Sequence, residues 1–159
     1  MLRGYDRATV DVDAVALEID QDLERFVEAA SEQGLTLRLG DGIQFARQHR
    51  VLLFRSPGGT GVDIALGALP FEDEVVARAT LAMIDQIEAR VATVEDLLIM
   101  KLIAGRPQDL DDVRRLSELY PDLDEERVKG TVTEYAALLE DAQILQNMEM
   151  LLPGRPDDP

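Results

Sequence analysis

The chain has 159 residues, of which 46% are hydrophobic and none is cysteine, so we expect a globular protein without disulfide bonds or a thiolate metal site. Its 32 acidic and 16 basic residues give a formal net charge of −16, which disfavours a general nucleic-acid-binding surface but still permits a local basic pocket. The N-terminus has no apolar signal region and no apolar run is long enough to cross a bilayer, so we expect a cytoplasmic protein that does not contact a membrane.

The first half of the chain has the alternating pattern of β-strands. Residues 8–17 alternate and are rich in valine, which predicts a strand. An amphipathic helix is expected over residues 20–33, and a short strand over residues 35–39. Residues 51–55 and 62–66 predict two further strands that pair antiparallel across a glycine-rich turn.

Two other segments of the first half are predicted to be irregular. Residues 40–42 contain two glycines and predict a turn. Residues 57–61 superficially resemble a phosphate-binding loop, but the lysine and the following helix of a P-loop are missing, so we interpret them as a turn.

His49, the only histidine, is expected at the surface rather than in catalysis.

The second half is predicted to be mainly helical. Thr93-Val94-Glu95-Asp96 resembles a capping box with Asp in the place of the usual Glu, and the helix that it opens is expected to end near Arg106. The other expected elements are a helix over 71–80, one or two short strands within 82–92, a helix over 109–119 that Pro107 begins, and a helix over 124–150 with a break at Gly130.

Strands followed by helices predict an α+β fold, with a small mixed β-sheet, flanking helices and a helical C-terminal part. We assign residues 1–92 to the α/β core and residues 93–152 to the helical part of the same domain. Residues 153–159 are expected to form a disordered tail.

Three aspartates stand at strand positions where a carboxylate needs an explanation. Asp11 and Asp13 are two residues apart, so both side chains project from one face of the strand, and Asp63 lies in a second strand between Val62 and Ile64. Carboxylates that meet on neighbouring strands suit Mg²⁺, which prefers oxygen ligands. The alternative is that the pair lies on the solvent-exposed face of an edge strand.

The helix after the capping box contains one lysine among apolar residues. Lys101 has Leu97, Leu98 and Ala104 as its neighbours on a helix, so its ammonium either extends to the surface or points into a cleft. Arg106 follows at the end of this helix. Asp109 comes next, and by itself it is a candidate helix cap.

Taken together, four segments resemble the AbiE-type (AbiEii-like) nucleotidyltransferases. Residues 4–13, GYDRATVDVD, are similar to the R-x-T-x-D-x-D signature, and residues 62–65, VDIA, are similar to the strand with the third carboxylate. Residues 93–102, TVEDLLIMKL, are similar to the family helix with the pattern ED-L-x-x-K-L. Residues 104–113, AGRPQDLDDV, are similar to the segment that follows it.

The resemblance implies a minimal nucleotidyltransferase fold that moves a nucleoside monophosphate from a nucleoside triphosphate to an acceptor, with Mg²⁺ as cofactor. It implies that Asp11 and Asp13 hold the metal and the triphosphate, and that Asp63 holds the metal or activates the acceptor. It assigns four residues to nucleotide binding: Thr9, Lys101, Arg106 and Asp109. Among them, Lys101 is implied to contact a phosphate. A toxin–antitoxin or phage-defence setting would add an antitoxin protein as partner, with RNA, protein or a small molecule as acceptor.

The chain departs from the family at its start. AbiE-type members have a helix and a Gly-Gly or Gly-Ser turn before the first signature, whereas only three residues precede Gly4 here. The alternative function is therefore a catalytically impaired nucleotidyltransferase fold that acts as a binding or regulatory module. For the enzyme, we expect Asp63 on the strand next to Asp11 and Asp13, and the ammonium of Lys101 directed toward these carboxylates.

Overall fold

A computed structural model describes residues 11–84 and 86–152. The chain forms two compact units that divide between Ala77 and Arg78. We call residues 11–77 the sheet unit and residues 78–152 the helical unit, and each is described by itself. The disordered tail expected at residues 153–159 lies outside the described residues, and the expected division at residue 92 stays a prediction.

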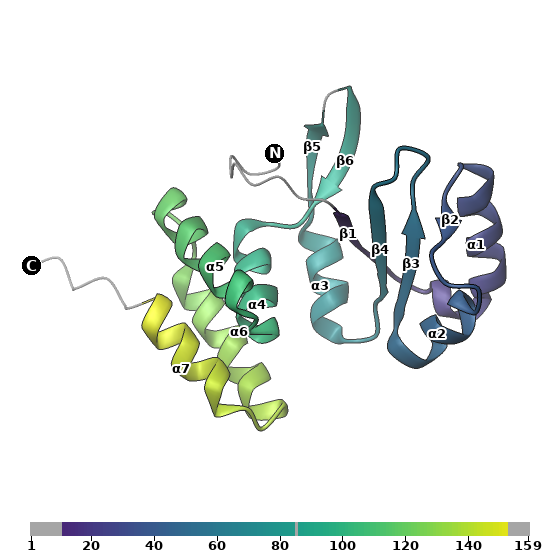
Figure 1. The fold of residues 1–159 in the computed structure, drawn as a ribbon. Coiled ribbons are helices and arrows are strands. Elements are labelled where there is room, and N and C mark those ends of the chain that lie inside the picture. Colours follow the sequence, from purple (N-terminus) through teal and green to yellow (C-terminus); the bar gives the residue numbers. More distant parts are fainter. Residues whose placement is uncertain (1–10, 85, 153–159) are drawn as a thin grey trace, which may run out of the picture. The chain divides into compact units, whose positions relative to one another are not determined.

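The sheet unit is built on a mixed four-stranded sheet (Figure 1). Its strands are β1 (Asp11–Ala16), β2 (Thr36–Leu37), β3 (Val51–Arg55) and β4 (Gly61–Leu66), and their order in the sheet is β1-β4-β3-β2. β1 pairs parallel with β4, whereas β3 pairs antiparallel with both β4 and β2. The predicted strands and the antiparallel pair across residues 57–61 are confirmed.

The helices of this unit are α1 (Leu23–Glu32), α2 (Gly42–His49) and α3 (Pro70–Arg78), with the 3-10 turn η2 (Ile19–Asp22) before α1. The last residue of α3, Arg78, already belongs to the helical unit. The side chain of Asp22 caps α1 by accepting a hydrogen bond from the Arg25 amide at 3.1 Å. Only a turn was predicted at residues 40–42, and α2 was missed. It has eight residues, too few for a clear helical period, and it is stabilised by Ala46, which is fully buried in the core.

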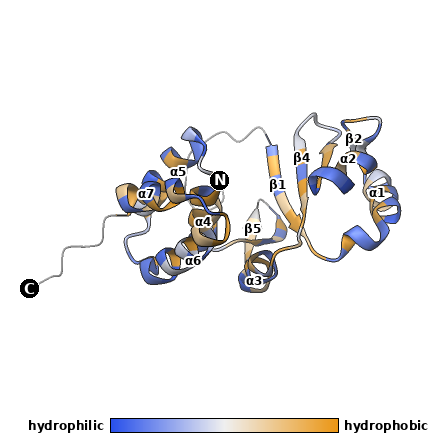
Figure 2. Cartoon of the chain, turned by 90° about the horizontal axis from the view of Figure 1, so that it is seen from below, coloured by the Kyte–Doolittle hydropathy of each residue, from blue (hydrophilic) through white to orange (hydrophobic). Residues whose placement is uncertain are grey.

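The core of the sheet unit lies on one face of the sheet. Leu52 and Phe54 of β3 are fully buried and cluster with Ile64 and Leu66 of β4, together with residues of α1 and α2. Hydrophobic residues follow the strands, while the helices carry hydrophilic residues on their outer sides (Figure 2). Because side chains alternate between the two faces of a strand, the residues between these positions project from the opposite face.

The helical unit begins with a two-stranded antiparallel hairpin of β5 (Thr80–Ile84) and β6 (Ile87–Val91). Four helices follow, and they pack on one another: α4 (Val94–Ala104), α5 (Pro107–Leu119), α6 (Glu125–Leu138) and α7 (Ala142–Leu151). The cap of α4 is confirmed, since the Thr93 hydroxyl accepts from the Asp96 amide at 3.2 Å. The fold is α+β, as predicted.

The break predicted at Gly130 was wrong. Gly130 continues α6, because Val128 and Val132 on either side of it are fully buried, and their packing outweighs the roughly 1 kcal/mol cost of a helical glycine. The chain breaks instead between α6 and α7, where Glu140 has a φ of 53°. Asp141 then caps α7 by accepting from the Gln143 amide at 2.9 Å.

Within the described ranges, none of the helices combines the length and apolar character needed to cross a bilayer.

Candidate active site

The parallel pairing of β1 with β4 brings the strand aspartates together. Asp13 and Asp63 are direct partners in the register, and Asp11 is the partner of Gly61. All three positions project from the sheet face opposite the core, because Leu52 and Phe54 occupy the other face. Asp63 therefore lies on the strand beside Asp11 and Asp13, as the sequence predicts. Which ions or substrates they bind stays a prediction.

An arginine that the sequence analysis did not select completes this face. The Arg38 amide donates to the Leu53 carbonyl at 2.8 Å, and Leu53 is the register partner of Asp63. Arg38, Leu53, Asp63 and Asp13 thus follow one another across the sheet. The Arg38 guanidinium extends over Leu53 and forms an ion pair with the Asp63 carboxylate, with both side chains about one-quarter exposed.

Gly61 shows how closely Asp11 and Arg38 approach the same point. A Cβ atom added at Gly61 would lie 2.9 Å from the Asp11 Cγ and 3.3 Å from the Arg38 Nη1. The Asp11 carboxylate occupies the space that a side chain at position 61 would fill, so a larger residue there would displace it. The guanidinium of Arg38 consequently contacts the Asp63 carboxylate and lies close to that of Asp11.

The charges on this face are unbalanced. Removal from water raises the pKa of the Asp63 carboxyl above its ordinary value, and the negative charges of Asp13 and Asp11 raise it further, against the opposing effect of Arg38. Asp11 and Asp13 are exposed, and neither forms an ion pair within residues 11–84 and 86–152. Three carboxylates therefore share one nearby guanidinium.

The three carboxylates have the right chemistry to bind a divalent ion, but their side chains are not arranged around a common ion position. They supply the oxygen ligands that Mg²⁺ prefers, and the negative charges of Asp11 and Asp13 help to raise the pKa of the Asp63 carboxyl. In the part of the chain that the structure describes, however, no three carboxylate or histidine groups surround a common point closely enough to hold a metal. The Asp63 carboxylate is instead paired with Arg38.

The predicted nucleotide-binding residues of the helical unit form a compact ion-pair cluster. The Lys101 ammonium lies 2.6 Å from Asp112 and 3.4 Å from Asp109. The Nε of Arg106 lies 2.5 Å from Asp109, and both carboxylates are almost fully buried. Asp109 does not cap α5, because Arg106 occupies the cap position and Asp109 lies in the first turn. Lys101 is held by these ion pairs, and its predicted orientation toward the strand aspartates involves both units and stays a prediction.

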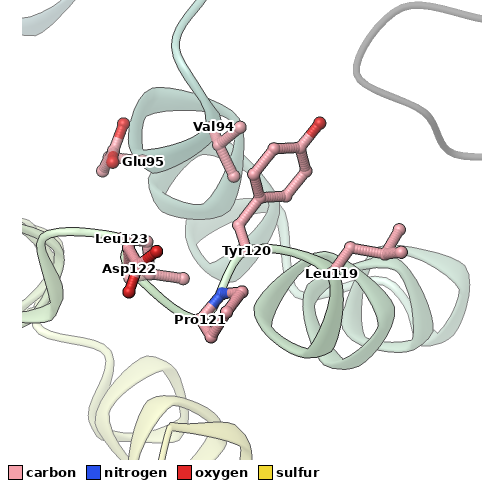
Figure 3. A pocket seen from close by; sticks show the side chains of 7 residues that line it. All are labelled: Val94, Glu95, Leu119, Tyr120, Pro121, Asp122 and Leu123. Atoms are coloured by element: carbon pink, nitrogen blue, oxygen red, sulfur yellow. The ribbon is translucent and has the colours of Figure 1, made fainter.

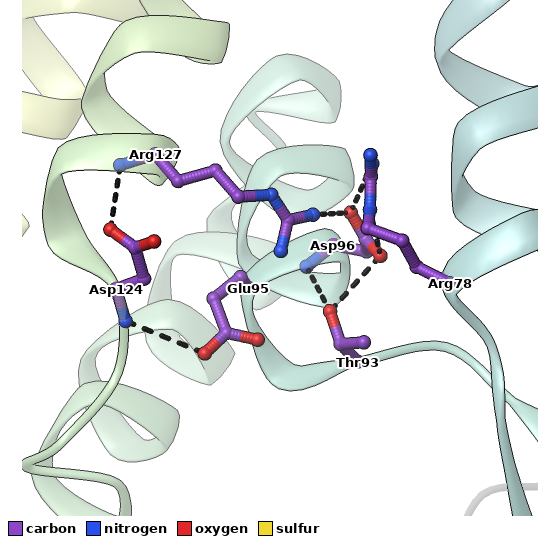
Figure 4. A network of polar contacts seen from close by, with 6 residues as sticks. All are labelled: Arg78, Thr93, Glu95, Asp96, Asp124 and Arg127. Atoms are coloured by element: carbon purple, nitrogen blue, oxygen red, sulfur yellow. Dashed lines mark hydrogen bonds and ion pairs between the residues drawn. The ribbon is translucent and has the colours of Figure 1, made fainter.

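A second cluster, which the sequence analysis missed, surrounds Asp96 (Figure 4). This carboxylate is fully buried and accepts from Arg78 at 2.9 Å, from the Thr93 hydroxyl at 3.0 Å, and from Arg127. The capping pattern identified the position of Asp96 but gave no indication of its burial. Two arginines of the helical unit neutralise this buried charge, so it needs no ligand to compensate it.

The helical unit also has a pocket of about 260 Å³ at the end of α5 (Figure 3). Its lining consists of Val94 and Glu95 together with residues 119–123. This volume is slightly below the range usual for small-molecule sites, which begins at about 300 Å³. None of the predicted site residues lines it, so we assign it no part in the candidate site.

Two further predictions concern single residues. His49 is exposed, as expected, and its ring packs on Phe45 with the centroids 4.3 Å apart. Thr9, predicted to bind the nucleotide, lies outside the described residues.

A mixed sheet with aspartates on adjacent strands, followed by helices, is the arrangement expected of a nucleotidyltransferase. Residues 1–152 match the family described as "Nucleotidyltransferase of unknown function (DUF6036)", and the chain belongs to that family. The match supports the nucleotidyltransferase resemblance and does not extend to the AbiE-type subgroup. Among curated proteins, none matches this chain.

Proposed function

We propose that this protein is a Mg²⁺-dependent nucleotidyltransferase that moves a nucleoside monophosphate from a nucleoside triphosphate to an acceptor. The observation that carries the proposal is the register of β1 with β4, which sets Asp13 beside Asp63 on the face away from the core. Membership of a nucleotidyltransferase family supports the same chemistry. The triphosphate is the substrate that the family description implies.

In the proposed reaction, an acceptor oxygen attacks the α-phosphorus of the triphosphate. The bond from that phosphorus to the oxygen bridging to the β-phosphate breaks, and pyrophosphate leaves with the bond electrons. Bound Mg²⁺ would neutralise charge on the phosphates, with Asp11 and Asp13 as its ligands. Asp63 takes the proton of the acceptor, a role for which a raised carboxyl pKa is suited.

In this proposal the helical unit contributes a hydrogen-bond donor to the triphosphate. Lys101 has three N–H groups, and two of them suffice for its contacts with Asp109 and Asp112. We assign the remaining one to a phosphate oxygen, with Asp109 fixing the positions of Lys101 and Arg106 through its two ion pairs.

We also propose a toxin–antitoxin or phage-defence setting, on the strength of the motif order shared with AbiE-type proteins. Expression of the wild-type chain without its antitoxin should then arrest bacterial growth. The Asp13→Asn variant should permit growth at equal expression. Normal growth with soluble wild-type protein would contradict this setting and leave the transferase proposal standing.

A second function, binding or regulation without catalysis, is favoured by one observation. The Arg38 guanidinium is paired with Asp63, and no complete metal-ligand set is formed within the described residues. A protein that retained the fold and lost catalysis would show the same pairing.

One experiment separates these functions. The protein is incubated with each α-phosphate-labelled nucleoside triphosphate, Mg²⁺ and a cell extract, and labelled products are resolved by gel and thin-layer chromatography. We expect transfer of label with one or more of the triphosphates. Asp13→Asn should reduce it by about a thousandfold, since metal ligation contributes several kcal/mol to such reactions.

The matched control is Asp111→Asn, at an exposed aspartate paired with Arg114, which should leave transfer unchanged. Triphosphate binding without transfer under all conditions would favour the binding module. Equal activity of wild type and Asp13→Asn would remove the proposed site.

A further inference from the structure

Arg38 lies in the region where a bound cation would contact the strand aspartates. Its guanidinium forms the ion pair with Asp63 and lies next to the Asp11 carboxylate above Gly61. That is the region in which a bound cation would meet the same carboxylates. A guanidinium and a metal ion cannot both neutralise Asp63 there without repelling one another.

The guanidinium is incompletely satisfied where it stands. Its Nε is buried and forms no hydrogen bond to the described residues. Arginine presents five N–H donors in a planar fork, and the ion pair with Asp63 uses only part of that fork. A buried donor without an acceptor is unfavourable, so a ligand with several oxygens would satisfy Arg38 better than Asp63 alone does.

The backbone allows the side chain to change partner while the strand stays in place. Arg38 follows β2 directly, and its amide is fixed to the Leu53 carbonyl at 2.8 Å. Its side chain is one-quarter exposed and reaches across Leu53 to the row of aspartates, so rotation about side-chain bonds is enough to release Asp63.

We propose that Arg38 is an exchangeable counter-ion: it neutralises Asp63 in the metal-free protein, and it turns to bind the triphosphate when a divalent ion on Asp11 and Asp13 supplies the positive charge beside Asp63. This inference rests on the proposed function, because it assumes a metal and a triphosphate at the same carboxylates. It assigns Arg38 to phosphate binding, a role that neither the resemblance nor the family match gives it.

The exchange has opposite consequences for the two ligands. Without the Arg38 charge, a divalent ion on Asp11 and Asp13 is no longer repelled by a neighbouring guanidinium and binds more tightly. The triphosphate loses one cationic partner and binds more weakly. If Arg38 only balanced the charge of Asp63, its removal would change the affinity for the divalent ion and leave the affinity for the triphosphate unaltered.

The test uses the full chain with Mn²⁺ as the metal probe and inorganic tripolyphosphate as the phosphate probe, which avoids any choice of base. Free Mn²⁺ is measured by electron paramagnetic resonance, and tripolyphosphate binding at saturating Mn²⁺ by calorimetry. For Arg38→Gln we expect Mn²⁺ to bind about tenfold more tightly, as for removal of one nearby like charge. Tripolyphosphate should bind about ten- to a hundredfold more weakly, the range for a charge-assisted hydrogen bond.

The matched control is Arg47→Gln, which removes an arginine paired with Glu24 in the same unit and should change neither affinity. Arg38→Lys keeps the charge and loses the fork, so it should bind Mn²⁺ as wild type does and tripolyphosphate several-fold more weakly. If Arg38→Gln itself fails to fold, this lysine variant and the Arg38 Nε resonance of the wild type provide the test. That resonance should shift on addition of tripolyphosphate with Mn²⁺.

The outcomes separate the two proposals. Unchanged or tighter tripolyphosphate binding by folded Arg38→Gln, or an unmoved Nε resonance, overturns the exchange and leaves the proposed transferase intact. Absence of Mn²⁺ binding by both the wild type and Arg38→Gln overturns both proposals, because the carboxylates are then not a metal site.

Discussion

Asp63 in the sheet unit and Asp96 in the helical unit are both carboxylates paired with arginine, and they differ in how their charge is balanced. Asp96 is fully buried and has two arginines and a threonine hydroxyl around it. Asp63 is partly exposed, has one arginine, and is repelled by Asp11 and Asp13. The first arrangement is complete without a ligand, whereas the second has excess negative charge. We infer that the helical cluster stabilises the fold and that the strand cluster is suited to a cation.

The largest difference should appear when each carboxylate is neutralised. Asp96→Asn removes the buried carboxylate that both guanidinium groups contact. We expect it to lower the free energy of unfolding by about 3 kcal/mol, near the lower end for a broken buried ion pair because both arginines keep some solvent contact. Asp63→Asn removes a partly exposed ion pair and should change the free energy of unfolding by less than about 1 kcal/mol. Urea denaturation followed by circular dichroism measures both.

The control is again Asp111→Asn, whose exposed pair with Arg114 should contribute almost nothing. Equal losses for Asp96→Asn and Asp63→Asn would show that the two clusters do not differ in the way described.

Divalent metal ions should stabilise the folded protein through the strand aspartates of the sheet unit. An ion that binds only the folded state stabilises it by about 2.7 kcal/mol at a hundredfold excess over its dissociation constant, so Mg²⁺ or Mn²⁺ should raise the melting temperature by several degrees. The double variant Asp11→Asn/Asp13→Asn should melt higher than wild type without metal, because repulsion of Asp63 is removed. It should not respond to the metal.

Screening of the −16 net charge can imitate this stabilisation, so NaCl at matched ionic strength is the necessary comparison. Equal stabilisation by NaCl and Mg²⁺, or an intact metal response in the double variant, would exclude a metal site at the strand aspartates.

A smaller loss is expected at the lysine of the helical unit. Lys101→Met leaves Asp109 and Asp112 buried without their shared ammonium, although Arg106 still pairs with Asp109. We expect a loss of about 2 kcal/mol in the free energy of unfolding, within the range for removal of a charged hydrogen-bond partner. Lys129→Met, at an i,i+4 pair with Glu125, should cost only about 0.5 kcal/mol. Similar losses for both lysines would contradict a special role of the Lys101 cluster in stability.

The smallest effect is a change in the titration of Asp63. Its pKa is raised in the folded protein, so the folded state holds the proton more tightly than the unfolded state. Its contribution to stability is therefore present at low pH and is lost as the pH rises from the unfolded pKa near about 3.9 through the folded pKa. In Asp11→Asn/Asp13→Asn, two causes of the raised pKa are absent, and the pKa should fall.

Carboxyl-carbon NMR titration measures this pKa directly. Glu24 is the internal reference, because its pKa is lowered by a backbone hydrogen bond and by Arg47 rather than by the strand aspartates. An unchanged Asp63 pKa in the double variant would show that the three carboxylates do not share one field.

Local patterns in the sequence were enough to predict most of the elements. Alternation predicted β1, β3 and β4, and Thr93 predicted the start of α4, because these signals depend on neighbours in the chain. The same patterns missed α2 and placed a helix break at Gly130. In both cases the outcome is decided by burial of apolar residues against distant segments, which a short window of sequence does not reveal.

The candidate site also contains residues that the sequence predicted and one residue that only the structure revealed. The spacing of Asp11 and Asp13 fixed their shared face, since the period of a strand is two residues. Asp63 was selected because it is a carboxylate between Val62 and Ile64 in a predicted strand. The part played by Arg38 was decided by tertiary structure alone. It lies 25 residues from Asp63 in sequence and reaches it only because β2 and β3 pair in a register that sets Arg38 in the row of Leu53 and Asp63. Strand registers between distant segments arise from packing of the whole core, and that is why no local pattern predicted this contact.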